Sequence, residues 1–215
     1  MILKSVARAM SPAGAQARLT ILIFHRVVSQ PDPLFPGEPD VRRFNDIVHW
    51  VSRWFKVLPL DQAVLQLQNA QLPPRAAAIT FDDGYADNVS NAMPVLQRHG
   101  VPATFFVATA FLNGGRMWND TVIESIRSCP HKALDLRTLG LGIVPLETTH
   151  HKRCAIDAVL AHIKYDPPDV RQKAVDCIVN LAGAGTPHEL MMRPSQLLQL
   201  RNAGMQIGAH TATHP

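Results

Sequence analysis

The short apolar run Ala76–Phe81 and the acidic turn after it constrain the fold of this chain most strongly. An apolar run of this length, followed directly by Asp82, Asp83 and Gly84, predicts a buried strand that ends in a sharp turn. Adjacent carboxylates repel each other, and a nearby divalent cation is the usual compensation because it favours their ionised form. The alternative is a pair of ordinary turn residues that cap the next helix, since Asp and Gly favour turns for backbone reasons.

A second apolar stretch, residues 205–209, ends in His210 and His214. Two imidazoles four residues apart can face one point from a helical turn or a compact loop, which suits two ligands of one metal ion. For an isolated pair of this spacing, two structural histidines would be the better interpretation. The acidic strand end elsewhere in the chain favours the metal instead, because three protein ligands and one open position are typical of catalytic zinc.

Expected strands alternate with expected helices through the first half of the chain. Strands are expected at 19–25, 56–60, 76–81 and 103–108, with helices at 41–56, 61–69 and 88–99. This alternation predicts an α/β fold with a parallel sheet and right-handed crossovers. Three expected strands end in polar groups, at His25, Asp82–Asp83 and His210, and functional residues gather at strand ends of this kind in a TIM-like barrel.

The middle of the chain, residues 113–187, breaks this alternation. Helices are expected at 120–128, 149–164 and 168–181, with a small β-structure within 134–147. We interpret 113–187 as a helical insertion within one domain spanning 19–215, preceded by an N-terminal extension of residues 1–18.

Composition excludes several functional classes. The chain is 47% apolar and 18% charged, as expected of a globular protein, and its net charge of +4 comes from scattered Lys and Arg residues. No basic stripe or known module indicates nucleic-acid binding. Three separated cysteines predict neither a zinc knuckle nor a disulfide framework. We identify no secretory signal and no transmembrane run, which makes the cytoplasm the default compartment.

Two motifs resemble those of the polysaccharide deacetylases, the NodB-homology or carbohydrate esterase family 4 group. Residues 80–84, Thr-Phe-Asp-Asp-Gly, are similar to the first motif, and residues 210–215, His-Thr-Ala-Thr-His-Pro, to the second. Asn88 and residues 21–27 and 102–107 also fit, whereas Ala209 stands where many members have Ser. The resemblance implies a distorted TIM-like (β/α)7 barrel. Later motifs of the family, containing Arg, Asp/Trp and Leu-x-x-His, have no match, so we expect a deacetylase domain truncated after the second motif.

The resemblance also implies roles for individual residues. Asp83, His210 and His214 would hold Zn²⁺, or another divalent metal such as Co²⁺ or Ni²⁺. Asp82 would be the general base, and the backbone N–H of Tyr85 a contact of the oxyanion.

The general acid has no match in the sequence. His25 is a candidate for that role, although a supporting role in the core or near the site is the better interpretation. Trp118 is a candidate for stacking on a sugar ring, with simple packing as its alternative.

The function implied by the resemblance is a metal-dependent hydrolysis that removes N-acetyl or O-acetyl groups from a polysaccharide or other glycan. Members of this family often act at the cell envelope. A catalytically impaired fragment or a sugar-binding pseudoenzyme of the same fold is the alternative, and a structural fragment without metal is a third hypothesis.

Overall fold

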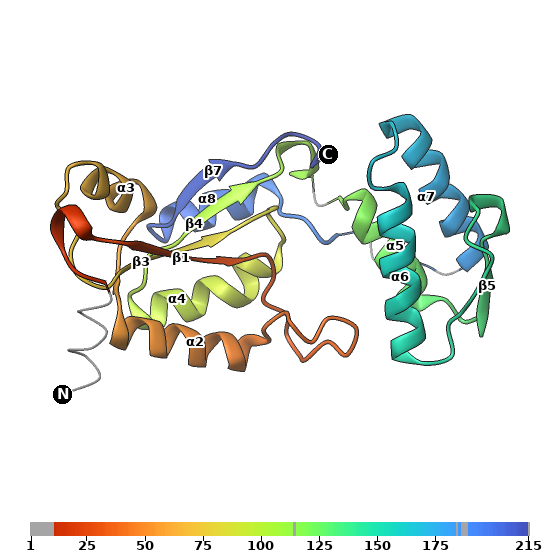
Figure 1. Ribbon diagram of the computed structural model, residues 1–215, viewed down its shortest axis with the longest axis horizontal. Coiled ribbons are helices and arrows are strands. Elements are labelled where there is room, and N and C mark those ends of the chain that lie inside the picture. The colour runs from red at the N-terminus through yellow and green to blue at the C-terminus, as the bar shows by residue number, and fades with distance from the viewer. Residues whose placement is uncertain (1–10, 114, 184, 186–188, 215) are drawn as a thin grey trace. The chain divides into compact units, whose positions relative to one another are not determined.

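The computed structural model describes residues 11–113, 115–183, 185 and 189–214 (Figure 1). These residues form two compact units. The first contains residues 11–32, 37–113 and 191–214, and the second contains residues 33–36 together with the described part of 115–190. None of the helices in the described part of the chain has the length and apolar character needed to cross a membrane.

The first unit is built on a five-stranded parallel sheet. Its strands are β1 (Leu19–Phe24), β2 (Lys56–Val57), β3 (Ala76–Phe81), β4 (Thr104–Val107) and β7 (Gln206–Ala209). The order is β1-β3-β4-β7, and β2 pairs with the first residues of β3. The expected α/β fold with a parallel sheet is therefore confirmed, and the carboxyl ends of β1, β3, β4 and β7 lie at one edge.

Strand β3 is the centre of this sheet. All its residues are buried, as the apolar run predicts. It pairs with β1 along its whole length, from Leu19–Ala76 to Phe24–Phe81, and with β4 at Thr80 and Phe81. A strand with neighbours on both sides has its backbone groups bonded and its side chains enclosed, which explains why its sequence lacks a polar face.

Helices α2 (Val41–Trp54), α4 (Met93–His99) and α8 (Pro194–Asn202) pack on one face of the sheet around a common core. Figure 1 shows α2 and α4 side by side along this face. Four aromatic rings lie at its centre. Phe81 stacks on Phe105 with centroids 4.7 Å apart, and Phe24 and Phe44 contact Phe81 at 5.5 and 5.7 Å.

The helix ends follow local chemistry. Asp40 caps α2, because its side chain accepts a hydrogen bond of 2.7 Å from the backbone N–H of Arg43. Gly100 ends α4 in the left-handed conformation. The expected helix over 88–99 begins as a π-turn, Asn88–Ala92, before α4. Pro94 lies at this junction and has no N–H to continue an α-helical ladder.

The other face of the sheet is partly open. Ile21 and Ile23 of β1 are 45% and 59% exposed, although their register partners in β3 are buried. Helix α3 (Leu60–Gln68) covers the amino ends of the strands on this side through a small cluster of Ala63, Leu72 and Ala76.

The second unit has its own core. It contains α5 (Trp118–Ser128), α6 (Thr149–Ile163), α7 (Pro168–Ala182) and an antiparallel pair, β5 (Ala133–Asp135) with β6 (Ile143–Pro145). The apolar faces of the three helices and the hairpin enclose one buried cluster.

Short 3₁₀ turns complete the described elements of both units, at Gly14–Gln16, Thr109–Phe111 and Arg137–Leu139.

We expect Phe81→Ala to lower the free energy of unfolding by about 3–5 kcal/mol, because the ring is fully buried between three other rings. Ile23→Ala is the control on the neighbouring strand, and its exposed side chain predicts a loss below about 1 kcal/mol. Urea unfolding of metal-free protein measures both. Equal losses would show that the aromatic cluster is not the stabilising centre of this unit.

Candidate metal centre

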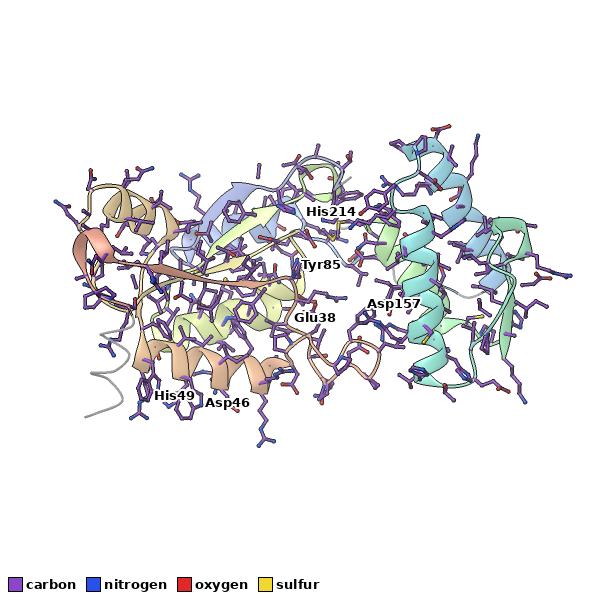
Figure 2. The ribbon with its side chains drawn as sticks, in the orientation of Figure 1. Glu38, Asp46, His49, Tyr85, Asp157 and His214 are labelled. Carbon is purple, nitrogen blue, oxygen red and sulfur yellow. The ribbon has the colours of Figure 1, made fainter. Side chains whose placement is uncertain are left out.

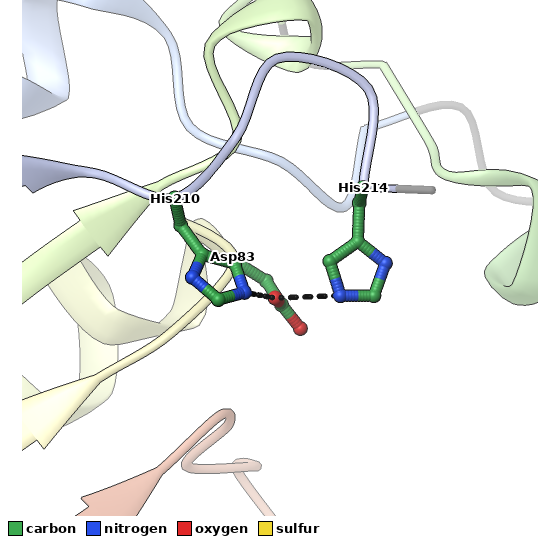
Figure 3. A group of neighbouring side chains, drawn as sticks. All are labelled: Asp83, His210 and His214. Carbon is green, nitrogen blue, oxygen red and sulfur yellow. Dashed lines mark ion pairs between the residues drawn. The ribbon is translucent and has the colours of Figure 1, made fainter.

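Asp83, His210 and His214 converge at the carboxyl ends of β3 and β7 (Figure 3). One ligand atom from each lies within 4.8 Å of the others. Oδ1 of Asp83 is 3.5 Å from Nε2 of His210 and 3.3 Å from Nε2 of His214. The structure thus brings together three side chains that lie far apart in the sequence, and it does so within the first unit alone.

Asp83 occupies an unusual backbone position. Its φ is +74°, a region that non-glycine residues seldom adopt, and its carbonyl accepts a hydrogen bond of 3.0 Å from the N–H of Ala108. The residue is only 4% exposed, and Oδ1 has no hydrogen-bond partner. A buried carboxylate oxygen without a hydrogen-bond donor costs free energy, and a bound cation would offset this cost.

Gly84 makes the turn possible. Its φ is +89°, and a Cβ at this position would lie 3.0 Å from Cγ1 and 3.1 Å from Cβ of Val107. Its carbonyl accepts a hydrogen bond of 2.9 Å from the N–H of Met192. Any other residue at this position would strain the backbone, and its Cβ would clash with Val107 at the end of β4. The turn therefore requires glycine here.

The two histidines lie on a compact loop after β7, one of the two arrangements that their spacing allowed. The N–H of His210 donates to the carbonyl of Val107 at 2.8 Å. Thr211 has a φ of +57°, and its hydroxyl accepts a 3.0 Å hydrogen bond from the N–H of His214. His214 itself has a φ of +48°. Such conformations persist only where the surroundings hold them, and they cluster at functional sites.

The donor set fits a divalent cation. Two ligands that are each about 2.1 Å from a tetrahedral zinc ion lie about 3.4 Å apart. The observed separations of 3.3 and 3.5 Å between Asp83 and the two imidazole nitrogens match this value. One hard oxygen and two borderline nitrogens, together with the unpartnered Oδ1, therefore form a candidate metal site.

Asp82 lies beside the cluster but is not one of its three members. Its N–H donates to the carbonyl of Phe24 at 2.9 Å, which continues the parallel β1–β3 ladder by one residue. Asp82 is therefore opposite His25 at the strand ends. His25 is exposed, and with Glu38 it lines a cavity of about 280 Å³.

A charged network borders the acidic turn. Nε of Arg26 donates to Asp87 at 2.8 Å, and the Arg26 guanidinium lies 4.8 Å from the centroid of the Tyr85 ring. Figure 2 shows Tyr85 and Glu38 at the same end of the first unit as His214.

The same network shifts two pKa values. Burial raises the pKa of Asp87, against the opposing effect of Arg26. Burial also raises the pKa of Glu38, against the charge of His25.

Trp118 lies in the second unit, as the first residue of α5. The guanidinium of Arg171 covers its ring at 4.7 Å from the centroid. One face of the indole is thus already occupied by a cation, which is the packing alternative considered for this residue.

Sequence reasoning missed the partners of the acidic turn. Arg26 contacts the ring of Tyr85, and Asp87 and Asn91 connect the segment after the turn to Arg26 and Val27, and no motif indicated these contacts. A polar residue directly after a predicted strand was the available signal for Arg26, and polar residues just after Gly84 were the signal for the others. Neither signal says which residues pair.

The sequence comparisons agree with each other. A family profile described as polysaccharide deacetylase matches residues 69–215. A protein of Bacillus subtilis (strain 168) named "Putative polysaccharide deacetylase YxkH" is 30% identical over 93 residues, which are 42% of this chain and 32% of that protein.

Solved structures of deacetylases also align with this chain. Streptococcus pyogenes deacetylase PplD in complex with acetate has a TM-score of 0.49 at 15% identity, and the alignment covers 92% of this chain and 57% of PplD. IcaB from Ammonifex degensii has a TM-score of 0.35 at 17% identity, with coverage of 90% and 97%. The chain thus spans less than two thirds of YxkH and of PplD.

We expect Gly84→Ala to be more damaging than Gly204→Ala, although both positions have positive φ. Gly204 has a φ of +79° and no atom within 4 Å of an added Cβ, so its substitution costs about 1–2 kcal/mol from backbone strain alone. The contact with Val107 adds about 1–3 kcal/mol at Gly84. Urea unfolding and zinc titration measure the two effects. Equal stability and equal zinc affinity in the two variants would contradict the role given to the Gly84–Val107 contact.

Proposed function

Because the chain belongs to the polysaccharide deacetylase family, we propose that it is a metal-dependent hydrolase that removes acetyl groups from a glycan. The observation that carries this proposal is the convergence of Asp83, His210 and His214 on one point at the carboxyl edge of the sheet. N-acetyl groups of a polysaccharide are the proposed substrate, with O-acetyl groups as a variant of the same chemistry. We further propose that the parallel sheet is part of the barrel that the sequence resemblance implies.

The proposed cofactor is Zn²⁺, or another divalent ion such as Co²⁺ or Ni²⁺. Such an ion, when bound, supplies Lewis-acid polarisation of a carbonyl and a lowered pKa of water. Asp83, His210 and His214 would hold it, which leaves room for substrate because only three protein groups are involved.

Asp82 is the proposed general base. It lies next to Asp83 in the turn, outside the ligand group, and is half-buried at the end of the β3 ladder. A carboxylate in this position can accept the proton of an attacking water, a contribution that is typically worth about 10²–10⁴-fold. The two neighbouring carboxylates would thus have separate tasks.

The backbone N–H of Tyr85 is the proposed oxyanion contact, because Tyr85 is the last residue of the turn that holds Asp83. His25 is the proposed proton donor to the leaving group, supported by its position opposite Asp82 across the ladder. For Trp118 the packing role is favoured over a sugar contact, because Arg171 already covers its ring.

We expect purified protein to hold about one equivalent of zinc, as three convergent ligands imply. Asp83→Ala, His210→Ala and His214→Ala should each lose most of it, whereas Asp82→Asn should retain it because Asp82 lies outside the ligand group. Metal analysis after dialysis measures the content. Equal losses in the Asp82 and Asp83 variants would reverse the roles given to these two residues.

Acetate release from chitin-like and poly-N-acetylglucosamine oligomers tests the activity. We expect zinc-dependent release by the natural protein, and loss of about 10²-fold or more in Asp82→Asn while its zinc remains bound. His25→Ala should slow release without changing zinc content. Bound zinc and glycan binding with no release from any N- or O-acetylated glycan would replace the hydrolase with a sugar-binding pseudoenzyme.

A further inference from the structure

We propose that the Arg26–Asp87 ion pair is a positioning element for the turn formed by Asp82–Tyr85, and that it acts on this turn through the ring of Tyr85. This inference rests on the proposed function, since it concerns the turn that would hold the metal and the general base. It gives a task to charged residues that no motif assigns.

The pair ties the end of β1 to the segment after the turn. Asp87 accepts from Nε of Arg26 at 2.8 Å through Oδ2 and from the N–H of Val27 at 3.3 Å through Oδ1. The two side chains are 12% and 25% exposed, for Asp87 and Arg26 respectively. A charge-assisted contact with this much solvent excluded is stronger and less screened than a surface ion pair.

Two asparagines make the same connection with neutral hydrogen bonds. Nδ2 of Asn88 donates to the carbonyl of His25 at 2.9 Å, and Nδ2 of Asn91 donates to the carbonyl of Val27 at 2.7 Å. The fold therefore joins these segments without the ion pair. The ion pair adds a contact that these two hydrogen bonds do not make, because the Arg26 guanidinium also lies over the Tyr85 ring.

The guanidinium carbon of Arg26 lies 4.8 Å from the centroid of the Tyr85 ring, and Tyr85 itself is buried. The carbonyl of Tyr85 also accepts a hydrogen bond of 3.1 Å from the N–H of Asn88. Arg26 is thus paired with the carboxylate of Asp87 and stacked on the ring at once. A planar guanidinium can satisfy both contacts, whereas a lysine ammonium cannot do so in the same way.

The turn needs such support because its backbone is strained. Asp83 has a positive φ, and a non-glycine residue in this region relaxes when its surroundings loosen. A shift of about 1 Å in a reacting group can cost about 10²-fold in rate. Without the stacked guanidinium, Tyr85 gains freedom, and Asp83 is only two residues away from it. The expected consequence is a change in the alignment of the site rather than loss of the fold.

The test is a double-mutant cycle with Arg26→Gln and Tyr85→Ala, in which Tyr85→Ala removes the ring and keeps the backbone N–H. For acetate release from N-acetylglucosamine oligomers, we expect Arg26→Gln to lower kcat by about tenfold or more, with KM and zinc content nearly unchanged. In the Tyr85→Ala background, Arg26→Gln should lower kcat by less than about twofold. Arg26→Lys keeps the charge, and its kcat should lie between the values for wild type and Arg26→Gln.

Arg137→Gln is the matched control, because it breaks an exposed Arg–Asp pair of 2.6 Å in the second unit. Its kcat, KM and zinc content should equal those of wild type. Full additivity of the Arg26 and Tyr85 effects, or wild-type kcat in Arg26→Gln, would overturn the inference.

A readout without turnover separates this inference from the proposed function. In Co²⁺-loaded protein, we expect the visible d–d absorption of Arg26→Gln to differ from wild type, whereas that of Arg137→Gln should not. Identical wild-type and Arg26→Gln spectra would overturn the inference even if the protein hydrolyses glycans. Failure to hydrolyse any acetylated glycan, with the spectral difference present, would count against the proposed function alone and would support the positioning role.

Discussion

The backbone at the end of β4 is the support on which the candidate metal centre depends. The carbonyl of Val107 accepts from the N–H of His210, and the N–H of Ala108 donates to the carbonyl of Asp83. The loop that carries the histidines continues along the same segment, where the carbonyls of Thr211 and Ala212 accept from Thr109 and Ala110 at 3.3 and 2.9 Å. The acidic turn and the loop that carries the histidines are thus both hydrogen-bonded to the same stretch of backbone. Neither half could shift alone without breaking hydrogen bonds in a partly buried edge.

This arrangement explains where the strain of the site is concentrated. Five non-glycine residues in the described part of the chain have positive φ, and three of them, Asp83, Thr211 and His214, belong to the site. A β-branched residue such as Thr211 adopts this conformation only under constraint. The hydrogen bonds that join Asp83, His210, Thr211 and Ala212 to residues 107–110 at the end of β4 provide that constraint.

Local patterns predicted the elements well. The apolar run to Phe81, the glycine turn and the alternation of strands and helices are all encoded in short segments, and the structure has most of them at nearly the expected bounds. The strand expected at 56–60 is shorter, since β2 ends at Val57 and α3 begins at Leu60. The pairing of β4 with β7 is different, because the second unit separates these strands in the chain and hydrogen bonding between distant strands leaves no periodicity in either one. The contacts of Arg26 with Asp87 and Tyr85 were unpredictable for the same reason. A charged residue in a sequence shows its charge but not its partner.

The two adjacent aspartates show how one backbone gives like residues different environments. Asp82 still follows the β3 ladder and stays half-buried at the open edge, opposite His25. At Asp83 the sign of φ changes, and the chain turns this side chain into a nearly closed position between the imidazoles. Oδ1 of Asp83 has no hydrogen-bond partner there, so a bound cation would stabilise this carboxylate, whereas the carboxylate at Asp82 is only half-buried. The left-handed conformation at one residue therefore separates the group proposed to hold a cation from the group proposed to accept a proton.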